Sequence, residues 1–242
     1  MVLQTADVPV ALLAGGLATR LGSLAGDVPK ALVEVAGRPF IDHQLSLLHR
    51  NGMRRVVICV GHLGKQIEAY LGDGADRGFE ISYAYDGDRL LGTAGALRRA
   101  LALLGDTFWV LYGDSYMDVD YRAILAEFDR RGARALMTVI HNNDQWDRSN
   151  AVFRDGRLLA YDKRQQTPEM HHIDYGIAVL TRGVVERVPE DVPFDLADLY
   201  RDLVSDGSMI GFEVHERFYE IGSAAGLEET RRRLTAGTGA RP

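Results

Sequence analysis

Cysteine and long hydrophobic runs are nearly absent from this chain of 242 residues. No apolar stretch reaches the ~18 residues that a membrane span needs, and the N-terminus lacks the basic-then-apolar layout of a signal peptide. We therefore expect a cytoplasmic protein with no membrane partner. The single cysteine, Cys59, excludes an internal disulfide. It lies in the apolar run 56–60 without a cationic or histidine neighbour, so we expect a buried core thiol.

The chain also lacks an excess of basic residues. Its formal net charge is −6 at pH 7, whereas a general nucleic-acid surface needs a basic face. We therefore expect no nucleic-acid partner. Only a few local cations remain to bind a phosphorylated ligand, which makes the positions of Arg20, Lys30 and Lys163 more informative than the total charge.

Several common site signatures are missing as well. Gly15 and Gly16 are adjacent and do not fit G-x-G-x-x-G, and Gly22 is too distant for G-x-x-x-x-G-K-[ST]. The chain contains no Gly-x-Ser-x-Gly elbow, which excludes the usual serine hydrolase. His171-His172 has no further ligand at zinc spacing, and adjacent histidines do not share one face of a helix or strand. We expect no zinc site there.

Hydrophobic patterning predicts alternating strands and helices over residues 1–140. This alternation implies an α/β protein with a Rossmann-like, doubly wound, mostly parallel sheet, covered by helices on both faces. Ligand sites in such sheets lie at the carboxyl ends of the strands. The expected strands are 8–14, 56–60, 81–85, 108–112 and 136–140, and the expected helices are 41–50, 66–71, 92–104 and 121–131.

The pattern changes after about residue 141, but we find no linker and expect a single domain. Asp155-Gly156 predicts a hairpin turn between strands 151–153 and 158–161. Asp195 is a candidate N-cap for a helix with Leu196, Leu199 and Leu203 on one face. We expect the second half to join the same sheet. The remaining expected elements are strands 177–180 and 209–214, a helix at 225–234 and a loose tail at 235–242.

The segment 11–32 is the most informative part of the chain. A hydrophobic strand runs into Gly15-Gly16, and Arg20 and Lys30 follow in the next loop. Glycines let the backbone approach a ligand closely and leave amide N–H groups for anions. The segment therefore fits a nucleoside triphosphate, with a glycine-rich strand–helix turn that carries incidental cations as the alternative.

This segment resembles the signature of the sugar-1-phosphate nucleotidyltransferases, on Gly15-Gly16-Leu17-Ala18-Thr19-Arg20-Leu21 and Pro29-Lys30-Ala31-Leu32. The resemblance implies the nucleotide-diphospho-sugar transferase fold, with residues 1–140 binding the nucleotide and 141–234, a smaller β-rich portion, binding the sugar phosphate. Gly92-Thr93 resembles the family's motif for the base and ribose, and an ordinary helix N-cap is the alternative. The implied nucleotide-binding residues are Ala14, Gly15, Gly16, Thr19, Arg20, Lys30, Gly92 and Thr93.

Asp114 directly follows the strand 108–112, in Gly113-Asp114. The resemblance implies that Asp114 binds Mg²⁺, a cation that prefers one or two carboxylates plus phosphate oxygens. A turn aspartate is the alternative. The family usually places a second metal-binding Asp near the C-terminus, where this chain has Glu220. The longer side chain changes where its oxygens reach, and a surface glutamate is the alternative.

The resemblance also implies a sugar site in the second half. A carboxylate–lysine pair in the family contacts the sugar hydroxyls and the sugar phosphate, and Asp162-Lys163 stands in that position. Asn150 and Asp174 align loosely with sugar-contacting positions and equally fit turn residues.

The resemblance implies an enzyme that makes a nucleoside diphosphate sugar and pyrophosphate, with Arg20, Lys30, Asp114 and Lys163 as catalytic residues. The segments 173–180, 195–200 and 215–222 look most like the D-glycero-D-manno-heptose 1-phosphate guanylyltransferases, which use GTP. Mannose 1-phosphate guanylyltransferases and N-acetylmuramate 1-phosphate uridylyltransferases are alternatives, and a non-catalytic sugar-nucleotide sensor is an alternative of another class. The sequence does not indicate the oligomeric state.

Overall fold

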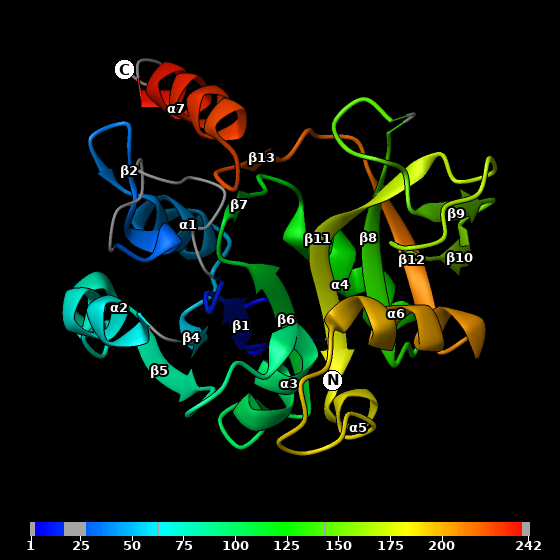
Figure 1. Cartoon of the computed structure of the whole chain (residues 1–242), viewed down its shortest axis with the longest axis horizontal. Helices are drawn as coiled ribbons and strands as arrows, with labels where there is room; N and C mark the ends of the chain where they lie inside the picture. Colours follow the sequence, from blue (N-terminus) through cyan, green and yellow to red (C-terminus); the bar gives the residue numbers. More distant parts are fainter. Residues whose placement is uncertain (1–2, 17–27, 62, 143, 239–242) are drawn as a thin grey trace.

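The computed structural model describes residues 3–16, 28–61, 63–142 and 144–238. Its centre is a nine-stranded sheet (Figure 1). The order is β10-β9-β11-β6-β1-β4-β5, and β11 also pairs with β8, which in turn pairs with β12. The strands are β1 (Val10–Leu13), β4 (Arg55–Val60), β5 (Glu80–Tyr85), β6 (Thr107–Tyr112), β8 (Ala135–His141), β9 (Ala151–Arg154), β10 (Arg157–Tyr161), β11 (His172–Thr181) and β12 (Met209–Val214).

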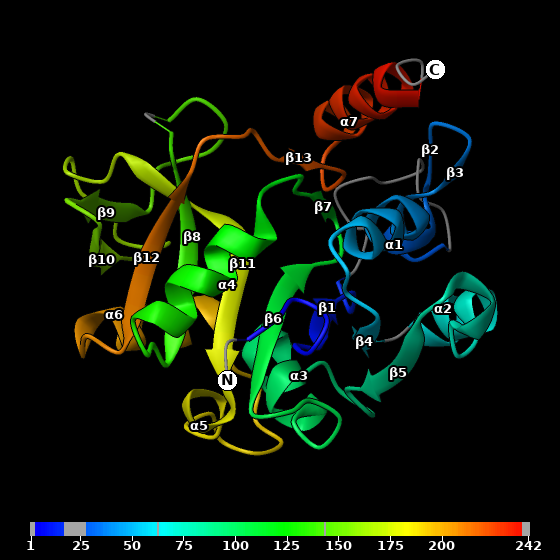
Figure 2. The same cartoon turned by 180° about the vertical axis from the view of Figure 1, so that it is seen from behind.

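Helices cover both faces of this sheet. Figure 1 shows α3 (Gly92–Ala100), α5 (Arg182–Val185) and α6 (Leu196–Ser205) in front of it. Figure 2 shows α1 (Phe40–Arg50) and α4 (Tyr121–Arg130) in front of the opposite face, with α2 (Gly64–Leu71) beside β5. Successive side chains of a strand point to opposite faces, and β1 follows this rule. Val10 and Leu12 pack into the α1/α4 core, whereas Ala11 and Leu13 pack into the α3/α6 core.

The predicted α/β fold is confirmed, including the joining of both halves in one sheet. Strands β1, β4, β5 and β6 are parallel, so their carboxyl ends meet at one edge. Strand β11 runs antiparallel to β6 and β8, and it connects the second half of the chain to the first. Within the part of the chain that the structure describes, no helix is long and apolar enough to cross a membrane.

Four short strands and two 3-10 turns were not predicted, and Val35 and Tyr116 from these strands belong to a third core outside the main sheet. The unpredicted elements are the pair β2 (Glu34–Val35) and β3 (Arg38–Pro39), and the pair β7 (Ser115–Tyr116) and β13 (Tyr219–Glu220), together with 3-10 turns at Lys30–Leu32 and Ala75–Arg77. The C-terminal helix α7 (Ala224–Thr238) packs on this core through Leu227 and Leu234.

Most predicted boundaries agree with the structure to within a few residues. The hairpin turn is confirmed, with positive φ at both Asp155 and Gly156, as a type I′ turn requires. The Asp195 side chain accepts a hydrogen bond from the Ala197 amide and caps α6 as predicted. Two ends were wrong. Helix α3 ends at Ala100 and not near Leu104, and α7 continues to Thr238, so residues 235–238 are helical, not a loose tail.

Candidate active site

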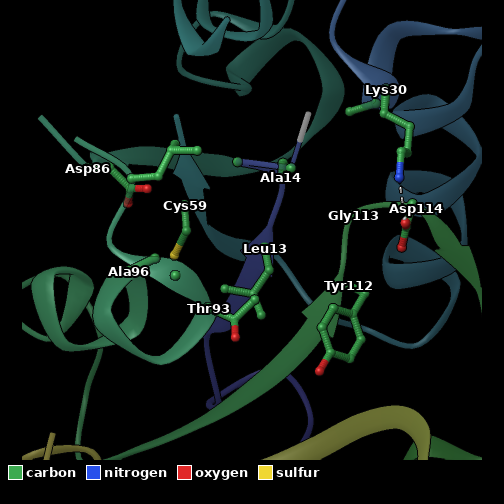
Figure 3. Close-up of a pocket in the computed structure, with 15 residues that line it drawn as sticks. Leu13, Ala14, Lys30, Cys59, Asp86, Thr93, Ala96, Tyr112, Gly113 and Asp114 are labelled. Carbon is green, nitrogen blue, oxygen red and sulfur yellow. Dashed lines mark hydrogen bonds and ion pairs between the residues drawn. The ribbon is translucent and has the colours of Figure 1, made fainter. Parts of the chain in front are cut away.

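A cavity of about 420 Å³ lies at the carboxyl edge of the parallel strands (Figure 3). Four strands contribute to it, because parallel strands release their following loops at the same edge. Its wall consists of Leu13, Ala14, Gly15, Gly16, Lys30, Ala31, Cys59, Asp86, Leu90, Gly92, Thr93, Ala96, Tyr112, Gly113 and Asp114. The predicted core thiol Cys59 is buried, and burial raises its pKa to about 12.

The loops after β1 and β6 touch each other at a glycine. The Gly113 amide donates to the Leu13 carbonyl at 2.9 Å, and a Cβ at Gly113 would stand 2.8 Å from that same carbonyl oxygen. A side chain here would force the loops apart. Glycine at position 113 therefore brings Asp114 beside the loop that begins at Ala14.

Lys30 and Asp114 form an ion pair at one end of the cavity, 84 positions apart in the sequence. The Lys30 Nζ lies 3.0 Å from the Asp114 Oδ2, and both side chains are partly exposed to the cavity. The other carboxylate oxygen, Oδ1, accepts a hydrogen bond from the Ser115 hydroxyl at 3.3 Å. A cation and a carboxylate therefore stand together where the sequence predicted them.

The small sheet brings Glu220 next to this pair. Strand β13 pairs Glu220 with Ser115, and the Ile221 amide donates to the Asp114 carbonyl at 2.9 Å. A Cβ at Gly222 would lie within 2.7 Å of the Glu220 Oε2, 3.5 Å of the Asp114 Oδ2 and 3.6 Å of the Lys30 Nζ. Three charged groups therefore surround Gly222.

The Glu220 carboxylate is bound to the start of α7. It accepts hydrogen bonds from the amides of Gly222 and Ser223 and from the Ser223 hydroxyl at 2.7 Å. Gly226, on the first turn of α7, leaves the space into which this carboxylate fits. Glu220 thus lies close to Asp114 while it caps a helix, a contact that sequence reasoning missed.

The donor set fits Mg²⁺ that also binds phosphate. Among the described residues, no three His, Cys, Asp or Glu side chains gather closely enough to hold a metal by themselves. Mg²⁺ does not require such a cage, since it commonly takes one or two carboxylates and completes its shell with phosphate oxygens and water. The hard oxygen of Asp114, at the edge of an open cavity, fits that role, and the Glu220 carboxylate lies on the other side of Gly222 as a second oxygen donor.

A second cavity, of about 580 Å³, adjoins the first. Tyr112 lines both cavities, and Glu220 and Gly222 line the second at its boundary with the Lys30–Asp114 pair. Aromatic side chains from the second half, Trp146, Tyr175 and Phe218, form one wall, with edge-to-face ring contacts among them.

Lys163 lies in this second cavity, paired with a carboxylate that the sequence had marked only weakly. Its Nζ is 3.4 Å from the Asp174 Oδ2 and 5.7 Å from the centre of the Tyr112 ring. Burial lowers the pKa of Lys163, but the Tyr112 and Asp174 side chains outweigh burial and raise it above its ordinary value. Lys163 therefore stays positively charged at neutral pH.

The side chains of Asn150 and Asp162 both accept hydrogen bonds from backbone amides. The buried Asn150 side-chain oxygen accepts from the Asp174 amide at 2.9 Å, which holds the strand beside Lys163, and Asn150 lines the cavity. The Asp162 carboxylate instead accepts from the amides of Arg164 and Gln165 and does not line either cavity. The carboxylate paired with Lys163 is thus Asp174, not its sequence neighbour.

The start of α3 is hydrogen-bonded to the segment that precedes and begins α6. Gly92 and Thr93 line the cavity as predicted, but the amides of Ala94 and Gly95 both donate to the Phe194 carbonyl. The Thr93 hydroxyl accepts from the Leu196 amide at 2.7 Å. The Phe194 carbonyl therefore takes up the Ala94 and Gly95 amides at this helix start.

Two predicted residues, Thr19 and Arg20, lie outside the described residues. One residue of the first cavity, Asp86, was not identified from the sequence. It lines the cavity and directly follows the predicted strand 81–85. Its position at a strand end was the available signal, because the same rule had identified Asp114.

These features define a Rossmann-like α/β protein with a two-part cavity at the carboxyl edge of its sheet. The chain belongs to the nucleotidyl transferase family, whose sequence profile matches residues 10–151. The family resemblance inferred from the first loop is thereby confirmed.

Curated relatives include enzymes for several bases and sugars. The UTP–glucose-1-phosphate uridylyltransferase of Synechocystis is 28% identical over 213 residues, which cover 81% of this chain and 55% of the relative. The D-glycero-alpha-D-manno-heptose 1-phosphate guanylyltransferase of Campylobacter jejuni is 28% identical over 220 residues, which cover 87% and 96%. An N-acetylmuramate alpha-1-phosphate uridylyltransferase of Neisseria meningitidis is 41% identical over 113 residues, which cover 46% and 49%. This chain spans little more than half the length of the Synechocystis relative and of a mannose-1-phosphate guanylyltransferase from Mycobacterium tuberculosis.

Solved structures share the fold. HddC from Yersinia pseudotuberculosis, complexed with GMP-PN, superposes with a TM-score of 0.78 at 22% identity, and the match covers 94% of this chain and 99% of that one. A putative glucose-1-phosphate thymidylyltransferase from Bacillus anthracis gives a TM-score of 0.84 at 20% identity, covering 94% and 95%. The predicted nucleotide-diphospho-sugar transferase fold is confirmed.

Proposed function

We propose that this protein transfers a nucleotidyl group from a nucleoside triphosphate to a sugar 1-phosphate. The observation that carries the proposal is the meeting of two cavities at Tyr112, with the Lys30–Asp114 pair at their boundary. One cavity begins at the glycine-rich loop and accommodates a nucleotide. The other contains Lys163 and accommodates a phosphorylated sugar.

The reaction needs positioning and charge stabilisation more than covalent help. An oxygen of the sugar phosphate forms a bond to the α-phosphorus of the nucleotide. The bond from that phosphorus to the β-bridging oxygen breaks, and its electron pair leaves with pyrophosphate. Lys163 holds the attacking phosphate, and Lys30 neutralises the triphosphate and the departing pyrophosphate, together with Arg20. Asp174 orients the Lys163 ammonium.

Asp114 is the group that would hold Mg²⁺, with Glu220 as its second carboxylate. The bound cation would supply positive charge to the phosphate oxygens. The Gly222 and Ser223 amides both donate to the Glu220 Oε2, and the Ser223 hydroxyl donates to Oε1, so these contacts leave Glu220 less acceptor capacity for a metal than Asp114 has. Asp114 is therefore the main metal-binding residue in this proposal.

For the particular substrates, we propose GTP and D-glycero-D-manno-heptose 1-phosphate. The Campylobacter jejuni guanylyltransferase supports this choice, because its similarity covers 87% of this chain and 96% of its own length. Relatives that act on mannose 1-phosphate and on N-acetylmuramate 1-phosphate keep those two activities as the alternatives.

A pyrophosphate-release assay tests the activity and the substrates together. The protein is incubated with Mg²⁺, each of GTP, UTP, CTP and ATP, and a panel of sugar 1-phosphates, with inorganic pyrophosphatase and malachite green as the readout. We expect release with GTP and the heptose phosphate. Release with another pair corrects the substrates, whereas binding of nucleotide without release for every pair favours a sugar-nucleotide sensor over an enzyme.

A further inference from the structure

The side chain of Gln44 connects helix α1 to the turn that carries Asp114. Its Nε2 donates to the Tyr112 carbonyl and to the Ser115 carbonyl, each at 2.9 Å. Tyr112 ends β6 and Ser115 begins β7, so the two carbonyls stand on either side of Gly113-Asp114. Figure 2 shows α1 beside β7. One amide group of α1 therefore spans the whole turn.

Gln44 is buried although only half of its amide has partners. The residue is 4% exposed, and its Oε1 has no hydrogen-bond partner within the part of the chain that the structure describes. Both partners of the Nε2 are carbonyl oxygens, which only accept, so the amide nitrogen must face the turn. A buried polar atom without a partner destabilises a fold, and an apolar side chain in α1 would avoid that loss. The two hydrogen bonds to the turn are thus the contribution of this amide.

The same turn is also held from two other elements through its backbone. The Gly113 amide donates to the Leu13 carbonyl at the end of β1, and the Ile221 amide after β13 donates to the Asp114 carbonyl, each at 2.9 Å. Gln44 supplies the third attachment, from α1. The backbone of Asp114 is thereby fixed from three directions, while its carboxylate stays partly exposed to the cavity.

Helix α1 supports the other member of the ion pair as well. The Phe40 amide at the start of α1 donates to the Val33 carbonyl at 3.0 Å, and the Val33 amide donates to the Lys30 carbonyl at 3.1 Å. The turn that carries Lys30 and the turn that carries Asp114 are thus both attached to one helix. The 3.0 Å distance from the Lys30 Nζ to the Asp114 Oδ2 depends on both attachments.

We propose that Gln44 is a positioning residue for nucleotidyl transfer, which fixes the Asp114 carboxylate beside Lys30. This inference rests on the proposed function, because it takes Asp114 as the residue that would hold Mg²⁺. Gln44 lines neither cavity, so it acts through the backbone of the turn and not on a substrate. A working group has to be held to within about 0.5 Å, and a displacement of about 1 Å can lower a rate about 100-fold.

The variant Gln44→Met tests the proposal in kinetics, because methionine is similarly long and unbranched but donates no hydrogen bond. At saturating substrates we expect kcat for pyrophosphate release to fall about 10- to 100-fold. The Mg²⁺ concentration that gives half the maximal rate should rise. The KM values for the nucleoside triphosphate and for the sugar 1-phosphate, measured at saturating Mg²⁺, should stay nearly unchanged, because Gln44 contributes to neither cavity wall.

Hydrogen exchange of the metal-free protein gives a readout that does not depend on catalysis. A peptide covering residues 110–118 contains the Gly113 amide, and a peptide covering Ile221 contains the amide that is bonded to the Asp114 carbonyl. Both peptides should exchange faster in Gln44→Met, since the loss of the two side-chain hydrogen bonds lets the turn open locally. Peptides from the distant strand β5 should exchange as in the parent.

Thr5→Val is the matched control, because it removes a similar hydrogen bond from the same helix. The buried Thr5 hydroxyl donates to the carbonyl of Asn51, the C-cap of α1, at 2.7 Å. Valine keeps the shape and removes the donor. We expect a lower Tm in this variant, with kcat and the exchange of residues 110–118 unchanged. If Gln44→Met does not fold, Gln44→Asn replaces it: its amide is one methylene shorter and cannot span both carbonyls, so it should give the same kinetic pattern.

The outcomes separate this inference from the proposed function. Parental kcat in Gln44→Met, or unchanged exchange over residues 110–118, contradicts the role of Gln44. A loss of kcat that Thr5→Val reproduces at an equal decrease in Tm assigns the effect to general destabilisation and contradicts it as well. If the parent protein releases no pyrophosphate with any substrate pair, nucleotidyl transfer is contradicted, whereas faster exchange of the turn in metal-free Gln44→Met still supports the attachment of Asp114 by Gln44.

Discussion

At the level of single residues, two carboxylates that line the first cavity have different surroundings. Asp114 stands 3.0 Å from the Lys30 ammonium and is partly exposed to the cavity. Asp86 is buried with a single amide donor among the described residues. The first environment suits a group that works beside phosphate and metal. The second leaves a buried carboxylate with unused acceptor capacity in the wall of the first cavity.

Replacing Asp114 by Asn should abolish most of the transfer activity. The substitution keeps the shape but removes the charge that would hold the cation, and the loss of one preorganised group in a charge-stabilising site costs about 10²–10³ in rate. The initial rate of pyrophosphate release at saturating substrates measures this. Asp118→Asn is the control, because Asp118 is an exposed carboxylate on the same segment that pairs with Arg50. Near-normal turnover of the Asp114 variant would contradict the assignment.

Replacing Asp86 by Asn should stabilise the free protein at neutral pH. The pKa of a raised carboxyl lies above its unfolded value of about 3.9, so its contribution to stability is greatest below that pH and is lost as the pH rises through the folded pKa. The variant removes the buried charge, and its Tm at pH 7 should exceed the parent Tm by a few degrees. The difference should shrink near pH 4. A lower Tm at pH 7 would indicate that the charge has a partner.

At the scale of the elements, helix α7 is connected to the site through the Glu220 carboxylate, which is hydrogen-bonded to the residues at its start. Glu220 caps its first turn, and buried Gly226 leaves the space for the carboxylate. Because β13 pairs Glu220 with Ser115, next to Asp114, the position of α7 and the position of Glu220 depend on each other.

Substitution of Gly226 by Ala should destabilise the protein, although alanine favours a helix by about 1 kcal/mol over glycine. The added methyl group would overlap the Glu220 carboxylate and displace it from the amides that it caps. Overpacking of this kind costs about 1–3 kcal/mol. Urea denaturation measures the change, with Gly183→Ala in α5 as the control, where a methyl group meets open space.

Introducing Gly226→Ala into a Glu220→Ala variant tests whether the loss of stability comes from the contact between residue 226 and the Glu220 carboxylate. With the carboxylate removed, Gly226→Ala should be neutral or stabilising, since only the helix preference remains. An equal loss of stability in both backgrounds would show that Gly226 is required for another reason.

At the scale of the whole molecule, the walls of the two cavities come from different halves of the chain. Residues before 115 line the first cavity, and the second cavity draws mainly on residues 146–176 and 218–223. Strand β11, paired with both β6 and β8, connects these halves within one sheet. Binding of the two substrates should therefore be separable by mutation.

Lys163→Met should raise the KM for the sugar 1-phosphate about 10-fold or more and leave nucleotide affinity nearly unchanged. A charged contact to phosphate contributes about 1.5–3 kcal/mol, and Lys163 lines only the second cavity. Steady-state kinetics gives KM, and calorimetry gives nucleotide affinity. The exposed Lys65→Met is the control. An equal loss of nucleotide affinity in the Lys163 variant would mean that the cavities act as one site.

Sequence reasoning succeeded at several places where the deciding interactions are local. The Asp155-Gly156 turn and the Asp195 cap depend on neighbouring residues, and both are confirmed. The position of Asp114 at a strand end also follows from the hydrophobic run before it. The α/β order could be predicted because each element carries its own periodicity of apolar residues.

The amino-acid sequence by itself thus determined the family and the order of the main helices and strands. Only the tertiary structure decided which distant groups meet: Lys163 with Asp174, and Glu220 with both Asp114 and α7. It also decided that the Phe194 carbonyl takes up the Ala94 amide. The physical reason is range, because a hydrogen bond or ion pair depends on ångström-scale distances between atoms, and residues far apart in the chain reach those distances only once the whole sheet is assembled.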